Sequence, residues 1–441
     1  MPHHPHKKRK NIEWFVLIII LSIAFVFRFD DLTSKPAGLH PEEAYSNELA
    51  QNAKATGEYK IFYSGNNLHN GQEGFYVNFG SVLSSIFYDS PWSLRFLSAI
   101  AGVLTVLGLY RLAKIIFTWQ IAAISSFLLA ISFWHVLFSR LGIRAILAPL
   151  FLVWALYYLW RAKQTHSLWH YGLSGLFWGI GIISYSGFIV MLIVLVVVLS
   201  VYWIAVQKHF WHARYVYIHH KILKGFSILL IVTFIVSLPM ILHYMQTPED
   251  IFNKLDQSPA GIISGSQSLG QRFLDTFNML ISKGDNHWLH NIPGMPALFW
   301  PVAMFFLFGL LRAFIKLTQH HDEHGHFSSS QVLLLSWFFV GMIPSMWAGN
   351  TPNAQTSLII SPVVFIFTAE GLWYMYEFIK KWYIVRDSHE VVVHNNHVSE
   401  GVLVGSIAII VFLFAIALYS YQTYFDVWLP LVEEQNIFLQ Y

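Results

Sequence analysis

The chain has 441 residues, of which 55% are hydrophobic and only 12% are charged, with a net charge of +3 and no cysteine. An ordinary soluble domain carries about 25% charged residues, so this composition excludes a soluble globule, a disordered chain and a nucleic-acid-binding domain. The absence of cysteine excludes disulfides, thiolate metal sites and catalytic thiols. The apolar runs are long and unbroken, which indicates a polytopic helical membrane protein and not a transmembrane barrel.

About eleven segments are long and apolar enough to cross a membrane, since a spanning helix needs about 20 mostly apolar residues. In chain order they lie near residues 12–29, 94–112, 116–137, 143–160, 168–184, 187–206, 225–243, 296–316, 330–348, 356–379 and 401–421. We therefore predict an all-α polytopic fold with one transmembrane domain over residues 12–421. A basic tail (1–11) would precede this domain, and a second tail (422–441) would follow it.

Lysines and arginines set the expected orientation. The first tail contains the basic run 7–10, and if this tail is cytoplasmic, most other lysines and arginines fall in inside loops, as the positive-inside rule requires. We expect a multi-pass protein of the cell membrane with a cytoplasmic N-terminus and an extracytoplasmic C-terminal tail.

This orientation leaves two large segments outside, at about 30–93 and 244–295. Loops of this length are usually functional or have structure of their own. Residues 41–56, 73–88 and 268–282 each have a helical apolar pattern that is too short to span. We expect these three helices to lie in the membrane interface.

Carboxylates mark both helix starts in the first outer segment. Glu42 and Glu43 follow Pro41, and Glu73 stands just before the 73–88 pattern. Carboxylates in a first helical turn suit the helix dipole, so a purely structural role is one interpretation. The other is a general base or a metal-binding carboxylate at the outer membrane surface.

Two further polar groups lie near the outer face. Arg140 and Arg144 are four residues apart and would share a helix face if the turn is helical. A lipid phosphate fits a guanidinium, although an ordinary headgroup anchor is equally consistent. The polar loop before the eighth span is either a plain loop or part of a site, and it contains Asp285, His287, His290 and Asn291. The histidine-rich tract at 320–326 is similar to metal-binding sequences, but it lies on the opposite face, and we do not expect a metal site there.

The order of these features resembles the GT-C superfamily of membrane glycosyltransferases. More narrowly, it is similar to prokaryotic relatives of the dolichyl-phosphate-mannose–protein mannosyltransferases. The resemblance covers roughly residues 10–380. It rests on five elements: Glu42-Glu43-Ala44, Glu73-Gly74-Phe75, Ser93-Leu94-Arg95-Phe96, Ser139-Arg140 through Arg144, and Gly284-Asp285 with His290-Asn291, Pro293-Gly294 and Pro296.

The chain departs from the family pattern at three places. Glu42 stands where relatives usually have Asp. The stretch 352–357 has no cation where relatives often have Arg, and the turn at 184–188 also continues without one.

The resemblance implies a glycosyltransferase of EC class 2.4 that takes a sugar from a polyprenyl-phosphate-linked donor in the membrane lipid. The acceptor would be an extracytoplasmic protein, lipid or glycan, and no nucleic acid is involved. Glu42, with Glu43 as second candidate, would be the general base, and Arg140 and Arg144 would bind the donor phosphate. The residues expected to bind sugar or acceptor are Glu73, Asp285, His287, His290 and Asn291. A divalent metal could be held by the carboxylates, although the sequence does not require one.

Two alternatives remain at this point. A flippase or other transporter of lipid-linked sugars would have ionisable groups buried mid-span and broken helices; Glu370 is one charge within a predicted span. A catalytically inactive relative that serves as an assembly subunit would be consistent with the departures from the family pattern.

Overall fold

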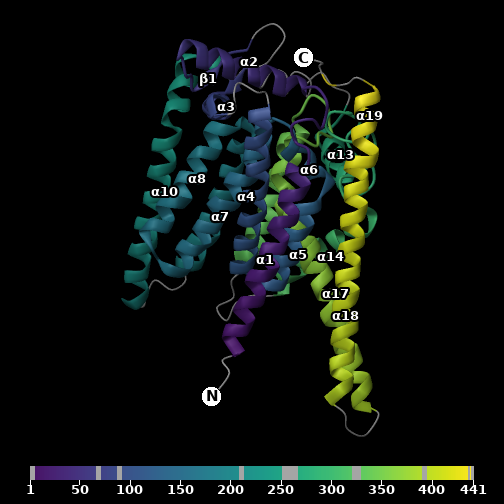
Figure 1. The fold of residues 1–441 in the computed structure, drawn as a ribbon. Helices are drawn as coiled ribbons and strands as arrows, with labels where there is room; N and C mark the ends of the chain where they lie inside the picture. Colours follow the sequence, from purple (N-terminus) through teal and green to yellow (C-terminus); the bar gives the residue numbers. More distant parts are fainter. Residues whose placement is uncertain are drawn as a thin grey trace.

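A computed structural model of the chain describes residues 5–65, 71–86, 92–207, 213–250, 267–319, 329–389, 395–435 and 438. The histidine-rich tract at 320–326 lies outside the described residues. The described chain is a bundle of long, roughly parallel helices, with the N-terminus at the lower end in Figure 1 and the C-terminus at the upper end.

Each of the predicted spans coincides with helix. The helices that correspond to the predicted spans, some of them in two pieces, are α1 (Pro5–Phe29), α4 (Trp92–Ile116), α5 (Trp119–Ile131) with α6 (Phe133–Arg140), η1 (Arg144–Ile146) with α7 (Leu147–Thr165), α8 (Leu168–Ser184), η2 (Ser186–Met191) with α9 (Leu192–Gln207), α10 (Ala213–Gln246), α14 (Trp300–Gln319), α15 (Ser329–Gly341) with α16 (Ile343–Met346), η3 (Thr356–Ile360) with α17 (Ser361–His389), and α18 (Asn395–Tyr421). Among the described residues, eight helices are long and apolar enough to cross a membrane alone, and a bent pair makes a ninth. The remaining two predicted spans, α8 and η2–α9, are shorter helices. The all-α polytopic fold is therefore confirmed.

Three short helices occupy the upper end of the bundle, as the sequence predicts. They are α2 (Pro41–Thr56), which runs across that end in Figure 1, α3 (Gly74–Ile86) and α13 (Leu269–Ile281). Pro41 begins α2, and Gly57 ends it in a left-handed conformation (φ 74°), which glycine adopts without strain. The described parts of the two predicted outer segments therefore lie at one end of the bundle.

A two-stranded hairpin, which the sequence did not predict, joins α2 to α3. Strand β1 (Phe62–Tyr63) pairs antiparallel with β2 (Gln72–Glu73). A Cβ atom on Gly74 would lie 1.9 Å from the Lys60 carbonyl oxygen, so only glycine allows this close approach of the chain. The hairpin fixes Gln72 and Glu73, which are both fully buried.

The third predicted span is not one continuous helix. The chain breaks between α5 and α6 at Ser132, with a bend of 56°. Arg28 of α1 is buried beside the break and donates to the carbonyl oxygens of Leu129 (3.4 Å) and Ala130 (2.8 Å). A helix break leaves carbonyl groups without partners in the helix, and the Arg28 guanidinium satisfies them.

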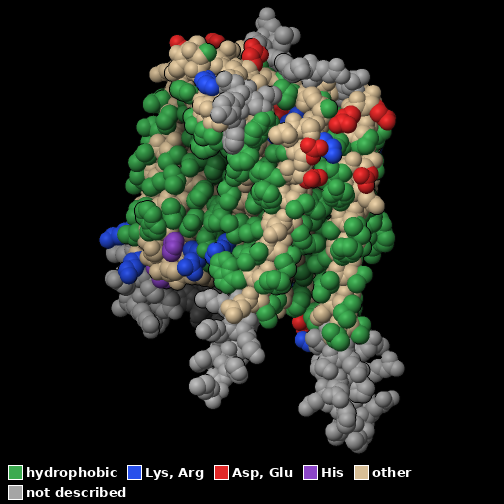
Figure 2. Space-filling model, in the orientation of Figure 1, with side chains coloured by type: hydrophobic (Ala, Val, Ile, Leu, Met, Phe, Trp, Pro, Cys, Tyr) green, Lys and Arg blue, Asp and Glu red, His purple; other side chains and the backbone are tan. Residues whose placement is uncertain are grey.

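Basic and acidic side chains are separated along the bundle. On the face shown in Figure 2, a broad hydrophobic band separates mostly basic side chains at the lower end from mostly acidic ones at the upper end. Residues 422–434, which the sequence places in a tail, continue as helix in η4 (Gln422–Trp428) and α19 (Leu429–Glu434). The indole of Trp428 donates to the Trp288 carbonyl (3.1 Å), so this segment packs against the second outer loop.

Candidate active site

Two carboxylates and a guanidinium converge at the end of the bundle where α2 lies. Glu42 comes from the first turn of α2, Glu73 from β2, and Arg144 from the start of η1. Arg144 Nη1 lies 3.0 Å from Glu42 Oε1, and Arg144 Nε lies 3.1 Å from Glu73 Oε2. We call these three residues the Glu–Arg–Glu cluster. Its formal charge is −1, and of its two carboxylates only Glu42, with 21% of its side chain exposed, reaches solvent.

Neutral groups complete the cluster. Arg144 Nη1 also donates to Gln72 Oε1, and the Ser186 amide donates to Glu73 Oε1 at 3.0 Å. Gln355 Nε2 donates to Glu42 Oε2 at 2.7 Å. Tyr185 is buried close to Arg144, and burial raises the pKa of its phenol, so the phenol stays protonated. The cluster therefore brings together side chains from segments that are far apart in the sequence.

Glu43 has a different environment from its neighbour Glu42. Its side chain is fully buried, with Oε1 2.7 Å from Arg95 Nε and Oε2 3.1 Å from Arg95 Nη2. Arg95 Nη1 also donates to the Pro36 carbonyl (2.8 Å). Burial raises the pKa of Glu43, while the Arg95 ion pair acts in the opposite direction. These contacts give Glu43 a role in holding the first outer loop on α4.

Arg140 and Arg144 do not share a helix face. The helix α6 ends at Arg140, and Leu141 and Ile143 are extended. A Cβ atom on Gly142 between them would lie 2.8 Å from Glu43 Oε1, so a tight contact with Glu43 fixes the chain in this conformation. The expectation of a shared face depended on a helical turn, and it fails because the helix ends.

Arg140 is fully buried within the protein and not exposed to lipid. It donates to Tyr424 Oη (3.1 Å) and to the carbonyl oxygens of Phe27 (3.2 Å), Asp30 (2.7 Å) and Lys35 (3.2 Å). Its guanidinium also lies 5.2 Å from the centroid of the Tyr424 ring. Arg140 therefore ties the end of α1 to η4.

The second outer loop forms a separate polar group beside the cluster. Asp285 is buried, and its Oδ2 lies 3.2 Å from His290 Nδ1 and accepts from the Ala354 amide (2.9 Å). Burial raises the pKa of Asp285, but the hydrogen bonds from His290, Ala354 and His287 outweigh it, so the net pKa is lowered. Asn291 is also buried, and it braces the loop by donating to the Asp285 and Met295 carbonyls.

Three imidazoles connect this loop to the start of α2. The ring centroids of His287 and His290 are 4.8 Å apart, and those of His290 and His40 are 6.3 Å apart. His40 caps α2, because its Nδ1 accepts from the Glu42 amide at 3.1 Å and its own amide donates to Glu43 at 3.3 Å. Burial, with nearby His290, His287 and Arg95, holds the pKa of His40 well below its usual range.

We expect this buried neutral His40 to make the fold sensitive to acid. The unfolded chain takes up a proton below about pH 6.5 and the folded chain does not, so stability is present above that pH and is lost as the pH falls. Between pH 7 and pH 5 the loss should be about 1–2 kcal/mol. It is measured as a fall in the thermal unfolding midpoint of the detergent-solubilised protein.

His40→Asn is the matched variant, because asparagine is also a good helix cap. This variant should have a flatter dependence of the unfolding midpoint on pH than the wild type. Parallel curves for the two proteins would contradict a role for His40.

The cluster also bears on metal binding. Within the described ranges, no group of three or more His, Asp or Glu side chains is arranged to hold a metal ion. Arg144 lies between Glu42 and Glu73, where a bound cation would be placed. The residues do not fit a metal site, and we derive no step through a metal.

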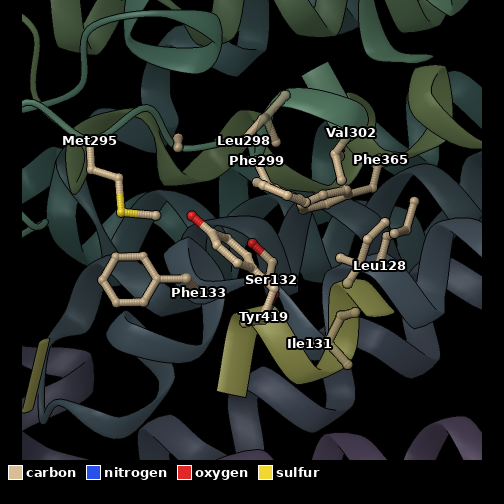
Figure 3. A pocket seen from close by; sticks show the side chains of 13 residues that line it. Leu128, Ile131, Ser132, Phe133, Met295, Leu298, Phe299, Val302, Phe365 and Tyr419 are labelled. Carbon is tan, nitrogen blue, oxygen red and sulfur yellow. The ribbon is translucent and has the colours of Figure 1, made fainter. Parts of the chain in front are cut away.

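An apolar cavity lies apart from these groups. Figure 3 shows its lining side chains at the break between α5 and α6, with the hydroxyl groups of Ser132 and Tyr419 among apolar neighbours from α5, α14, α17 and α18. None of the predicted site residues lines it, so we do not place a reaction there.

Comparison with known proteins identifies the architecture. Residues 79–242, from α3 to α10, match the family model described as dolichyl-phosphate-mannose-protein mannosyltransferase. Among solved structures, the chain is similar to ArnT from Cupriavidus metallidurans bound to undecaprenyl phosphate (TM-score 0.59, 14% identity), with 96% of this chain and 77% of that chain covered. It is also similar to the Archaeoglobus fulgidus oligosaccharyltransferase (TM-score 0.57, 16% identity). The chain has the GT-C fold.

The GT-C resemblance predicted from the sequence is thereby confirmed. The alignment with the archaeal oligosaccharyltransferase covers 93% of this chain but only 55% of that enzyme, so the chain spans little more than half of its length. A further structure of that protein, AglB, was solved in complex with an inhibitory peptide and a dolichol-phosphate (TM-score 0.56, 16% identity, 98% of this chain and 56% of that chain). No curated protein sequence matches the chain.

Several residues of the site were not predicted from the sequence. Gln72 and Gln355 are neutral and stand in segments without a distinctive pattern. The sequence identifies Arg95 only as part of the Ser93–Phe96 motif, and it predicts a catalytic role for the partner of Arg95, Glu43. One feature of the sequence could have identified Arg95. It is a cation near the start of an apolar helix, where a charge without a partner is unfavourable, so an acidic partner is expected.

Proposed function

We propose that the chain transfers a sugar from a polyprenyl-phosphate-linked donor to an acceptor hydroxyl at the outer face of the membrane. The observation that carries this proposal is the Glu–Arg–Glu cluster. It offers a partly exposed carboxylate 3.0 Å from a guanidinium, at the end of the bundle where both outer loops lie. The GT-C fold supports the same reaction class, and the match to a mannosyltransferase family model favours a mannose-like donor.

Glu42 is the general base in this mechanism. The acceptor oxygen attacks the anomeric carbon of the donor, and its proton passes to a carboxylate oxygen of Glu42. The bond between the anomeric carbon and the phosphate oxygen breaks, and both bonding electrons leave with the polyprenyl phosphate. Glu42 then releases the proton to water. Glu43 is less suited to this step, because its side chain is fully buried against Arg95.

Arg144 stabilises the leaving phosphate. Its contacts with Glu42, Gln72 and Glu73 engage Nε and Nη1. No hydrogen bond to another described residue engages Nη2, which leaves a donor for a phosphate oxygen. A fixed guanidinium at the point where negative charge develops lowers the barrier to departure. Arg140 has its donors on the protein itself, so we assign the phosphate to Arg144 alone.

The second outer loop would bind the sugar or the acceptor. His287 is exposed, and His290 is partly exposed beside it. Asp285 fixes the orientation of His290 through its hydrogen bond to Nδ1, which leaves the other imidazole nitrogen for a sugar hydroxyl. Asp285, Asn291 and Glu73 act indirectly in this proposal, since all three are buried in contacts with the protein.

The transporter alternative has less support. A charge within a predicted span and a broken helix do occur, as that alternative requires. In both cases, however, a contact within the protein accounts for the feature. Arg28 satisfies the carbonyl groups at the α5–α6 break. Glu370 forms an ion pair with Lys316 at 2.6 Å.

A transfer assay tests the proposed function. Membranes that contain the protein should move radiolabel from polyprenyl-phosphate sugars to cell-envelope acceptors, whereas nucleotide sugars should give no label when lipid-donor synthesis is blocked. Membranes without the protein are the control. Transfer from nucleotide sugars alone, or no transfer with a full panel of lipid-linked donors and acceptors, would contradict the proposal.

A further inference from the structure

Gln355 holds the carboxylate of Glu42 from the side opposite Arg144. Gln355 Nε2 donates to Oε2 of Glu42 at 2.7 Å, and Arg144 takes Oε1 at 3.0 Å. An ionised carboxylate only accepts hydrogen bonds, so the amide nitrogen and not the amide oxygen must face it. Each oxygen of Glu42 therefore has one fixed donor, of which one is charged and the other neutral.

The residue before Gln355 is held through both of its backbone polar groups. The Ala354 amide donates to Asp285 Oδ2 at 2.9 Å, and the Ala354 carbonyl accepts from the Trp134 indole at 2.8 Å. Ala354, Asp285 and Trp134 are all buried. A functional side chain is positioned well when the groups behind it are themselves locked by packing and hydrogen bonds. Contacts from the second outer loop and from α6 thus fix the backbone next to Gln355, from which its side chain extends.

The turn that carries Gln355 is also closed on itself. Asn353 Oδ1 accepts from the Thr356 amide at 2.9 Å, and the Asn353 amide donates to Ser345 Oγ at 3.0 Å. These contacts place the turn at the start of η3 and leave the Gln355 side chain directed at α2. Its partner Glu42 comes from the first outer segment, so this hydrogen bond joins that segment to the turn before η3 at the proposed base.

The neutrality of Gln355 matters for the chemistry. A second cation at this position would favour the ionised carboxylate further and weaken it as a proton acceptor. A carboxylate there would disfavour ionisation. An amide orients the oxygen and leaves the local charge unchanged.

We propose that Gln355 is a positioning residue that orients Glu42 for proton transfer, through a path of contacts that runs from Asp285 and Trp134 to the Ala354 peptide. This inference rests on the proposed function, because it assigns Gln355 to the base of that reaction. It adds a residue outside the charged cluster and gives Asp285 a role on the protein side of the site.

Two variants of nearly equal size test the inference. Gln355→Met removes the donor, and Gln355→Glu replaces it with a like charge. Both should lower kcat about tenfold while the donor KM stays within about threefold, because orientation and not binding is lost. In Gln355→Glu the acidic limb of the pH–rate profile should also move up by about one pH unit. Monodisperse elution and an unchanged unfolding midpoint establish that each variant is folded.

Gln271→Glu is the matched control. Gln271 donates to Asp275 Oδ1 at 2.9 Å on the exposed face of α13, so this substitution disrupts the same type of contact away from the site. It should leave kcat, KM and the pH profile unchanged. If both Gln355 variants keep kcat within about twofold and the acidic limb is unmoved, the inference is wrong. A raised donor KM with unchanged kcat would also overturn it, since Gln355 would then bind substrate.

A second readout separates this inference from the proposed function. A water-soluble carbodiimide modifies protonated carboxyl groups without any substrate, and peptide mass spectrometry reports the extent at Glu42. The pH dependence of modification at Glu42 should move upward in Gln355→Glu relative to wild type and to Gln271→Glu. The same profile in all three proteins would overturn the role of Gln355, whether or not the wild type transfers sugar.

Discussion

Glu42→Gln is expected to reduce sugar transfer by about 100-fold or more, because general base catalysis contributes about 10²–10⁴-fold. Glutamine has nearly the same shape as glutamate and can still hydrogen-bond to its neighbours, so the fold should persist. The variant loses the capacity to take the acceptor's proton, together with the negative charge beside Arg144. We expect kcat to fall while the donor KM stays within a few-fold, as measured by initial rates with labelled donor.

Two variants from the same outer segment provide the comparison. Glu58→Gln changes a carboxylate whose side chain is 70% exposed, and its transfer rate should equal that of the wild type. Glu43→Gln disturbs the ion pair with Arg95, and it should retain far more activity per folded molecule than Glu42→Gln. Equal activity in the Glu42 and Glu43 variants would remove the assignment of the base.

Arg95→Met is expected to destabilise the protein by about 3–5 kcal/mol, because it leaves the Glu43 carboxylate buried without its cation. The pair is almost fully buried, with 3% of the Arg95 side chain and none of the Glu43 side chain exposed. The substitution also removes the donor to the Pro36 carbonyl. The thermal unfolding midpoint in detergent should fall by several degrees or more.

Lys35→Met is the control for this experiment. Lys35 forms an ion pair with Asp31 at 3.2 Å, but both side chains are more than 40% exposed, and such pairs contribute about 0–1 kcal/mol. The double variant Arg95→Met/Glu43→Gln should recover part of the lost stability, since no buried charge remains. If Arg95→Met lowers the stability of the protein no more than Lys35→Met does, the Arg95–Glu43 ion pair does not hold the first outer loop as we describe.

Local patterns allowed much of the fold to be predicted. Pro41 and Gly57 mark the two ends of α2 in the sequence, and the structure has the helix between them. The apolar runs gave the helices of the bundle, because length and hydropathy are properties of a segment alone. The break at Ser132 could not be predicted in this way. It depends on Arg28, which is distant in sequence and satisfies the exposed carbonyl groups.

The candidate site was predictable only in part. Charged groups at the outer face are scarce, which made Glu42, Glu73 and Arg144 recognisable. Their mutual contacts depend on the Gln72–Glu73 hairpin and on the end of α6, which are consequences of tertiary packing. Gln355 carries no charge and follows no local pattern, so only its contact with Glu42 identifies it.

The fate of the donor lipid tests the central claim most directly. Purified protein in proteoliposomes, supplied with a polyprenyl-phosphate sugar and an acceptor, should release one polyprenyl phosphate for each sugar that appears on the acceptor. Both products can be quantified by chromatography with doubly labelled donor. Intact donor that moves to the opposite leaflet, with no polyprenyl phosphate released, would contradict the account and identify a transporter instead.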